Sequence, residues 1–359
     1  MKKLLSLGLI AAFIGFQGCS TDFDVAGDYK ELSIVYGLLD LNDNPSNGGS
    51  GHNIRVQKAF LGEIDAAIMA STPDSSYFPV EDLMVTLTEY DAQGDAKNHF
   101  VLSDIMIDGK DTTGGYGFFG PDQRVYHTDE NLVGGNEYEL LVHNTKSGYR
   151  DSARVELINS NSFRFTAPNS NVPKLLFHDP SNGYRPRTIT VSNPAGVKTG
   201  ELWLRFHYRE VLDGNPDTLF KQLDMQITTF IFENIGTPNN FSIAFNGETF
   251  YQTLGTTLEP LVGGHRLSGI RYNPVNAAND AAELFVHIGG TDLYDYITIN
   301  APSTSGSLTD NVVYSNMAVG KGLFSSRSQE FFPVYLFLDG FSTQQLMSGQ
   351  YTSDLGFTE

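Results

Sequence analysis

The chain has 359 residues, of which 23 are Lys or Arg and 42 are Asp or Glu, so its formal net charge at pH 7 is −19. This charge repels the phosphates of nucleic acid and argues against a DNA or RNA partner. Hydrophobic residues make up 40% of the chain and charged residues 18%, which indicates a folded protein with a sizeable core. A single cysteine excludes an intrachain disulfide and any structural zinc site with more than one Cys ligand.

The first residues have the layout of a secretory signal peptide. Lys2 and Lys3 supply a positive start, and an apolar run follows over residues 4–16. That run is shorter than the ~20 apolar residues that a membrane-spanning helix needs. We therefore interpret it as a signal for export.

The end of this signal resembles a bacterial lipobox, because the small residue Gly18 precedes the sole cysteine, Cys19. The resemblance implies that residues 1–18 are removed, that Cys19 is the lipid attachment site and that residues 19–29 form a tether. Ser20 in place of Asp favours the outer membrane under the sorting rules of such lipoproteins. The face, periplasmic or extracellular, stays open, and a plain signal peptide with an incidental cysteine is the alternative.

The body of the chain alternates apolar and polar residues in short stretches broken by Gly, Asn, Asp and Pro, which is typical of antiparallel strands. In residues 30–40, Leu32, Ile34, Tyr36 and Leu38 share one face. Residues 134–157 read as two strands joined by a turn, similar to the last hairpin of a fibronectin-III or immunoglobulin-like sandwich. Strands are predicted over 30–40, 83–90, 138–142, 153–157, 188–192, 201–211, 225–233, 241–245, 283–288 and 333–338.

A stretch rich in Pro, Asn and Ser, residues 166–173, has the composition of a linker. We therefore predict a mainly β protein with two antiparallel β-sandwich domains of immunoglobulin or fibronectin-III type, over residues 30–165 and 174–359. A few short helices are expected over 62–70, over 246–254 with Asn246 as cap, and over 292–299 with Thr291 as cap.

No assembled catalytic motif is evident. The string G-x-G-x-x-G occurs at 115–120, but Pro121 follows it where a nucleotide-binding helix would begin. No histidine pair has metal-ligand spacing, and no G-x-S-x-G elbow is present. We predict no cofactor and no catalytic activity, while an enzyme with a site assembled from distant residues is an open alternative.

Two other kinds of ligand remain open. Residues 40–45 begin like an oxygen-ligand calcium loop, although Pro45 replaces the required glycine, and Asp213, Asn215 and Asp217 form a second oxygen-rich loop. Aromatic rings are the natural platform for a glycan. The available rings are Trp203, Tyr208, Phe241, Phe250, Tyr251, Tyr272, Tyr294 and Tyr296.

The lipobox, together with the segments 36–39, 58–60, 293–297 and 322–327, resembles Bacteroidota outer-membrane lipoproteins in families of unknown function. The resemblance implies an accessory protein and brings no catalytic residue. We therefore predict a lipid-anchored binding module of the cell envelope whose partner is an outer-membrane or surface protein, with carbohydrate binding as the first alternative.

Overall fold

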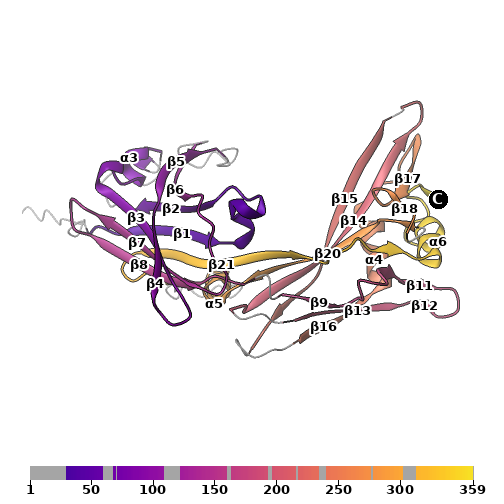
Figure 1. Ribbon diagram of the computed structural model, residues 1–359. Helices are drawn as coiled ribbons and strands as arrows, with labels where there is room; N and C mark the ends of the chain where they lie inside the picture. The colour runs from indigo at the N-terminus through magenta and orange to yellow at the C-terminus, as the bar shows by residue number, and fades with distance from the viewer. Residues whose placement is uncertain are drawn as a thin grey trace, which may run out of the picture.

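The computed structural model describes residues 30–59, 68–69, 71–108, 122–159, 163–192, 196–215, 217–233, 240–275, 278–301 and 313–358. The signal, the tether and Cys19 lie outside these residues, as do most of the predicted helix 62–70 and the glycine string 115–120. The described chain is mainly β, with several sheets and short helices, and it is of β-sandwich type (Figure 1). The predicted fold class is confirmed.

The largest sheet has ten strands in the order β23-β17-β14-β20-β21-β1-β2-β6-β5, with β15 paired to β14. Its strands are β1 (Ser33–Leu39), β2 (His52–Lys58), β5 (Ser103–Ile107), β6 (Gln123–Thr128), β14 (Thr199–Leu212), β15 (Thr218–Ile231), β17 (Gly264–Ser268), β20 (Ala282–Gly289), β21 (Lys321–Phe331) and β23 (Phe357–Thr358). Most pairs are antiparallel, but β1 pairs with β21 in parallel, with Tyr36 opposite Leu323.

Smaller sheets pack against this one. A four-stranded sheet contains β4 (Ala96–Val101), β3 (Leu83–Tyr90), β7 (Glu137–Asn144) and β8 (Arg150–Glu156), and a three-stranded sheet contains β16 (Asn240–Asn246), β13 (Pro186–Ser192) and β9 (Phe165–Ala167). Three two-stranded pairs are β10 (Lys174–Leu175) with β22 (Phe337–Leu338), β11 (His178–Asp179) with β12 (Gly183–Tyr184), and β18 (Tyr272–Asn273) with β19 (Ala278–Asn279).

Strand β21 connects two hydrophobic cores. Phe324 is fully buried in a cluster with side chains of β1, β2, β3 and β7, whereas Phe332, just past the end of β21, belongs to a cluster with β14, β20 and α4 (Gly247–Thr257). Figure 1 shows β21 as a long strand running from one half of the molecule to the other. The division of the chain at residues 166–173 remains a prediction, and the structure adds that β21 makes one continuous sheet across both halves.

The described helices are α3 (Pro73–Ser76), α4, α5 (Thr291–Ile299) and α6 (Gly340–Ser348), with 3₁₀ turns at Leu41–Asp43, Pro45–Asn47 and Val80–Asp82. Asn246 caps α4 as predicted, because its Oδ1 accepts a hydrogen bond from the Glu248 N–H at 3.0 Å. Helix α5 begins one residue early, with Gly290 at the cap position. Among the described residues, no helix is long and apolar enough to cross a membrane.

A buried histidine joins the first loop to the sheet. His52 is fully buried, and its Nε2 lies 2.8 Å from Asn44 Oδ1. That oxygen also accepts a hydrogen bond from the Leu132 N–H, so the His52 Nε2 carries the proton and donates. Burial lowers the pKa of His52; repulsion from His127 acts in the same direction, and the nearby carboxylate of Asp43 opposes both.

This lowered pKa predicts a loss of stability in mild acid. The unfolded chain, with an ordinary histidine pKa of about 6.5, takes up a proton that folded His52 resists, so unfolding is favoured as the pH falls below that value. We expect the free energy of unfolding in urea to fall by more between pH 7.5 and 5 in the wild type than in His52→Gln. The difference is bounded by about 1.4 kcal/mol per pH unit. Equal pH dependence in the two proteins would contradict this assignment.

Candidate functional site

Strand β1 has two apolar faces. Val35 and Leu39 are fully buried in the core, whereas Tyr36 and Leu38 lie half-buried on the opposite face. The sequence correctly placed Tyr36 and Leu38 on one face, but the core lies on the other. A strand that is apolar on both sides needs a second cover, and helix α5 provides it.

Helix α5 lies on the outer face of β21 without being embedded in a core, since none of its residues is fully buried. Leu293 rests directly on Gly289 of β20, where a Cβ would stand 2.8 Å from Leu293 Cδ2. The helix can approach the sheet this closely because Gly289 has no side chain. At its first turn, Tyr314 donates a hydrogen bond of 2.6 Å to Asp292.

Two cavities flank this helix. The β1 cavity has a volume of about 530 Å³ and includes Tyr36 and Tyr296 in its lining. The β14 cavity, of about 520 Å³, includes Glu201 and His287. The two cavities share Leu38, Leu293, Ile297 and Arg327. They therefore meet at α5, over the line where the two halves of the large sheet join.

Next to the β14 cavity, three aromatic side chains form a line across three strands. Trp203 of β14 stands opposite Phe285 of β20, which stands opposite Phe331 of β21. The ring centroids are 6.2 Å apart for the first pair and 5.6 Å for the second. Phe285 is only 2% exposed, Trp203 is half-buried and Phe331 is 46% exposed. We call these three residues the aromatic row.

One polar row borders the aromatic row on the side of the β14 cavity. Glu201 stands opposite His287, which stands opposite Gln329. Glu201 accepts a hydrogen bond from Trp203 Nε1 at 3.3 Å, and the His287 ring lies edge-on to Trp203. Desolvation lowers the pKa of His287; the carboxylates of Glu201 and Asp224 oppose this shift, and Arg327 and Arg205 add to it. The imidazole is therefore neutral at pH 7, with one donor and one acceptor nitrogen.

The second polar row lies on the other side and consists of paired polar side chains. Arg205 makes two hydrogen bonds to Asp224, at 2.7 and 2.8 Å, and its guanidinium lies 5.0 Å from the Phe285 ring centre. The hydrogen bonds from Arg205 lower the pKa of Asp224. His207 Nε2 lies 2.8 Å from Glu283. These pairs fix the aromatic row from one side and leave little free charge there.

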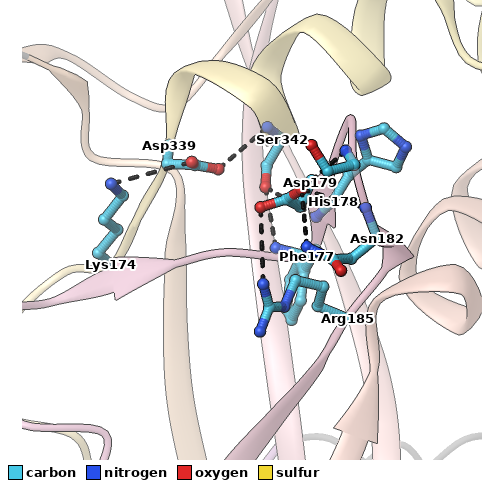
Figure 2. Close-up of polar contacts among 9 residues, drawn as sticks. Lys174, Phe177, His178, Asp179, Asn182, Arg185, Asp339 and Ser342 are labelled. Atoms are coloured by element: carbon cyan, nitrogen blue, oxygen red, sulfur yellow. Dashed lines mark hydrogen bonds and ion pairs between the residues drawn. The ribbon is translucent and has the colours of Figure 1, made fainter.

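A second group of polar contacts gathers at the start of α6 (Figure 2). Asp339 caps the helix by accepting from the Ser342 N–H at 3.0 Å, and Ser342 Oγ accepts from the backbone N–H groups of Phe177 and His178. Asp179 accepts from two N–H groups of its own turn, and Arg185 lies 3.5 Å away.

These residues include Ser, His and Asp, but they do not form a nucleophile and its base. Ser342 is fully buried, its hydroxyl contacts the backbone of His178, and Figure 2 shows the imidazole directed away from it. The His178 ring packs edge-on against Tyr184. The cluster therefore joins α6 to the β11–β12 hairpin. A third cavity, of about 790 Å³, adjoins the start of α6 and includes Lys174, Asp339 and Tyr272 in its lining.

The rings proposed from the sequence are separated by the fold. Trp203 and Tyr208 lie on opposite faces of β14, because they are five positions apart and a strand alternates its faces. Tyr208, Phe250 and Tyr251 are buried in the core, Phe241 packs against it, and Tyr272 lies at α6. Only Trp203, Tyr294 and Tyr296 of the proposed set are near α5.

In the two oxygen-rich loops, the side-chain oxygens already make hydrogen bonds within the protein. Asp40 accepts from the Asn42 N–H, Asn44 holds Leu132 and His52, and Asn215 accepts from the Asp217 N–H. Within the part of the chain that the structure describes, no group of three His, Cys, Asp or Glu side chains is arranged to hold a metal ion.

Sequence reasoning missed Phe331 and the role of Phe285. Both residues alternate with core residues along β20 and β21, which places them on the outer face, but their contact with Trp203 depends on strand register.

Compared with known proteins, the chain matches no protein-family model and has no significant match among curated proteins.

Proposed function

We propose that this protein is a non-catalytic binding module of the cell envelope, held at the outer membrane by a lipid on Cys19, and that its ligand binds beside α5. The observation that supports this most is the aromatic row next to the β14 cavity. Ligand sites commonly combine a concave apolar surface of about 300–1,000 Å³ with a few convergent polar groups. The β14 cavity, of about 520 Å³, falls in this range.

Binding rather than proton transfer is favoured by the way the charges are paired. Asp224, the carboxylate beside the aromatic row, is bound by Arg205 through two hydrogen bonds. A general acid or base needs a proton that is free to move to the substrate, whereas these groups stabilise each other. Their arrangement suits a rigid, preorganised surface.

A second candidate function is that of an accessory subunit that docks on another outer-membrane or surface protein. Strands β14 and β15 have 14 residues each and form a hairpin that projects from the body (Figure 1). Near its tip, Phe220 is 65% exposed and Val262 is 90% exposed. Exposed aromatic side chains of this kind are often anchors of protein interfaces.

One experiment tests the anchor and the site together. Phe331 is replaced by a photoreactive phenylalanine analogue in the wild type and in Cys19→Ala, and intact cell envelopes are irradiated. We expect the wild type in the membrane fraction, with an adduct at position 331 whose mass identifies the ligand class. Cys19→Ala should be released into the soluble fraction with an unchanged urea unfolding curve, because residues 19–29 are predicted to be a tether.

The same analogue at position 341 is the matched control, since Phe341 is 49% exposed on α6, away from the aromatic row. The analogue at position 220 tests the second candidate. An adduct at 220 alone would favour the accessory subunit over the site beside α5. Retention of Cys19→Ala in the membrane would contradict the lipid anchor.

A further inference from the structure

We infer that the ligand beside α5 is a neutral saccharide chain, with one sugar ring against the aromatic row and a neighbouring ring in the β14 cavity. This inference rests on the proposed function and assigns the chemical class of its ligand. It is carried by four features of the site: the rings, the uncharged polar groups, the paired charges and the size of the cavity.

The rings supply an apolar surface in a polar setting. Phe285 is buried between Trp203 and Phe331, so it supports them, while the two outer rings reach solvent. The C–H faces of a sugar ring pack on aromatic surfaces, whereas its edges carry hydroxyl groups. A row of rings with polar groups on both sides matches this division of surface.

The polar groups at the mouth of the cavity both donate and accept hydrogen bonds. Neutral His287 and the Gln329 amide each offer a donor and an acceptor, and Glu201 offers acceptors. Thr298 and Tyr294, which carry hydroxyl groups, line the same cavity. Sugar hydroxyls are themselves donors and acceptors, so each of these groups has a matching partner on a saccharide.

The charges near the site disfavour an ionic ligand. Arg205 is neutralised by Asp224, and Arg327 Nε lies 3.6 Å from Asp40. Of the remaining charges, Glu201 is exposed and negative, the ammonium of Lys198 lies 5.6 Å from the Tyr294 ring centre, and the net charge of the chain is −19. A polyanion such as an acidic glycan or a phosphorylated polymer is therefore repelled, and a neutral chain is not.

The shape of the site suits a chain rather than a single small molecule. The aromatic row lies on an open sheet face, and the adjoining β14 cavity has α5 as a wall through Leu293, Tyr294 and Ile297. Ile297 of this helix is exposed and lines both cavities, so the β14 cavity adjoins the β1 cavity at α5. A flexible chain can lie across the row and continue beside the helix.

The chain offers a direct test, because Trp203 is its only tryptophan. The mature protein is titrated with six neutral hexasaccharides, built from β-1,4-glucose, α-1,4-glucose, β-1,3-glucose, β-1,4-mannose, β-1,4-xylose and β-1,4-N-acetylglucosamine. We expect saturable quenching and a blue shift of the Trp203 emission with at least one of them. Calorimetry should then show about tenfold weaker binding for Trp203→Ala and for Phe331→Ala.

Phe341→Ala is the matched control and should bind as the wild type does, since its ring is equally exposed but lies on α6. The absence of a saturable response to all six hexasaccharides overturns the saccharide assignment, as does binding that Trp203→Ala leaves unchanged. If a peptide adduct forms at position 331 in the envelope while no hexasaccharide binds, the proposed binding site stands and its ligand class is a protein. If neither an adduct nor a response appears, both proposals fail.

Discussion

Replacing Asp151 by Ala is expected to lower the free energy of unfolding by about 3–5 kcal/mol, because it removes a buried carboxylate that many donors share. Asp151 is 2% exposed on β8. Its Oδ1 accepts from the N–H groups of Ser152 and Val319, both at 2.9 Å. Its Oδ2 accepts from the Gly320 N–H at 3.0 Å and from the Ser33 hydroxyl.

These contacts tie three distant segments together. Ser33 begins β1, Asp151 lies on β8, and Gly320 immediately precedes β21, so one carboxylate holds the point where the two halves share a sheet. Without it, the Gly320 N–H remains in a buried setting and the Val319 N–H in a partly buried one, both without this acceptor, and a fully buried group of this kind costs about 1–3 kcal/mol.

Urea unfolding followed by far-UV circular dichroism measures the effect. Asp104→Ala, at an exposed position of β5, is the control and should change the free energy of unfolding by no more than about 0.5 kcal/mol. Asp151→Asn should fall between the two, since one oxygen acceptor survives. A loss below about 1 kcal/mol for Asp151→Ala would show that the network is not needed to join the strands.

The second large effect is expected at Gly322, whose replacement by Ala should destabilise the protein by about 3 kcal/mol or more. Gly322 has φ of +122°, a conformation that L residues rarely adopt. A Cβ at this position would stand 1.8 Å from the Val35 carbonyl oxygen. The substitution therefore forces β1 and β21 apart at the first pairs of their parallel register, Ile34 with Lys321 and Val35 with Gly322.

A second glycine separates the clash from the backbone conformation. Gly94 has φ of +83°, and no atom lies within 4 Å of the place that a Cβ would occupy, so Gly94→Ala carries conformational strain alone. We expect about 1 kcal/mol for Gly94→Ala in the same urea assay. Equal losses at Gly94 and Gly322 would mean that the contact with β1 contributes nothing.

Local features of the fold were predictable because they depend on residues close in the chain. The alternation of residues 83–90 predicted β3 with its observed bounds, and the turn at residues 147–148 predicted the β7–β8 hairpin. The Asn246 cap predicted α4. Helix α6 was missed, although Asp339 caps it, because its Gly, Ser and Thr residues give little helical periodicity.

The Gly320-Lys321-Gly322 segment shows where local interpretation fails. Two glycines around one lysine are typical of a turn, but Gly322 lies inside β21, and its lack of a side chain allows the close approach of the Val35 carbonyl, which belongs to the first strand of the chain. Tyr36 and Leu38 show the same limit of local interpretation. Their shared face was evident from the alternation, but their cover, α5, comes from the far end of the chain.

The sequence by itself determined the local elements of this protein: its strand periods, its hairpin turns and its helix caps are set by neighbouring residues and by backbone preferences that act over a few positions. The tertiary structure decided which strands meet, in which register, and hence that Trp203, Phe285 and Phe331 line up beside a cavity. The physical reason is that strand pairing and burial are cooperative, long-range choices: a shift of one residue in β20 or β21 would turn these rings into the core and leave no site.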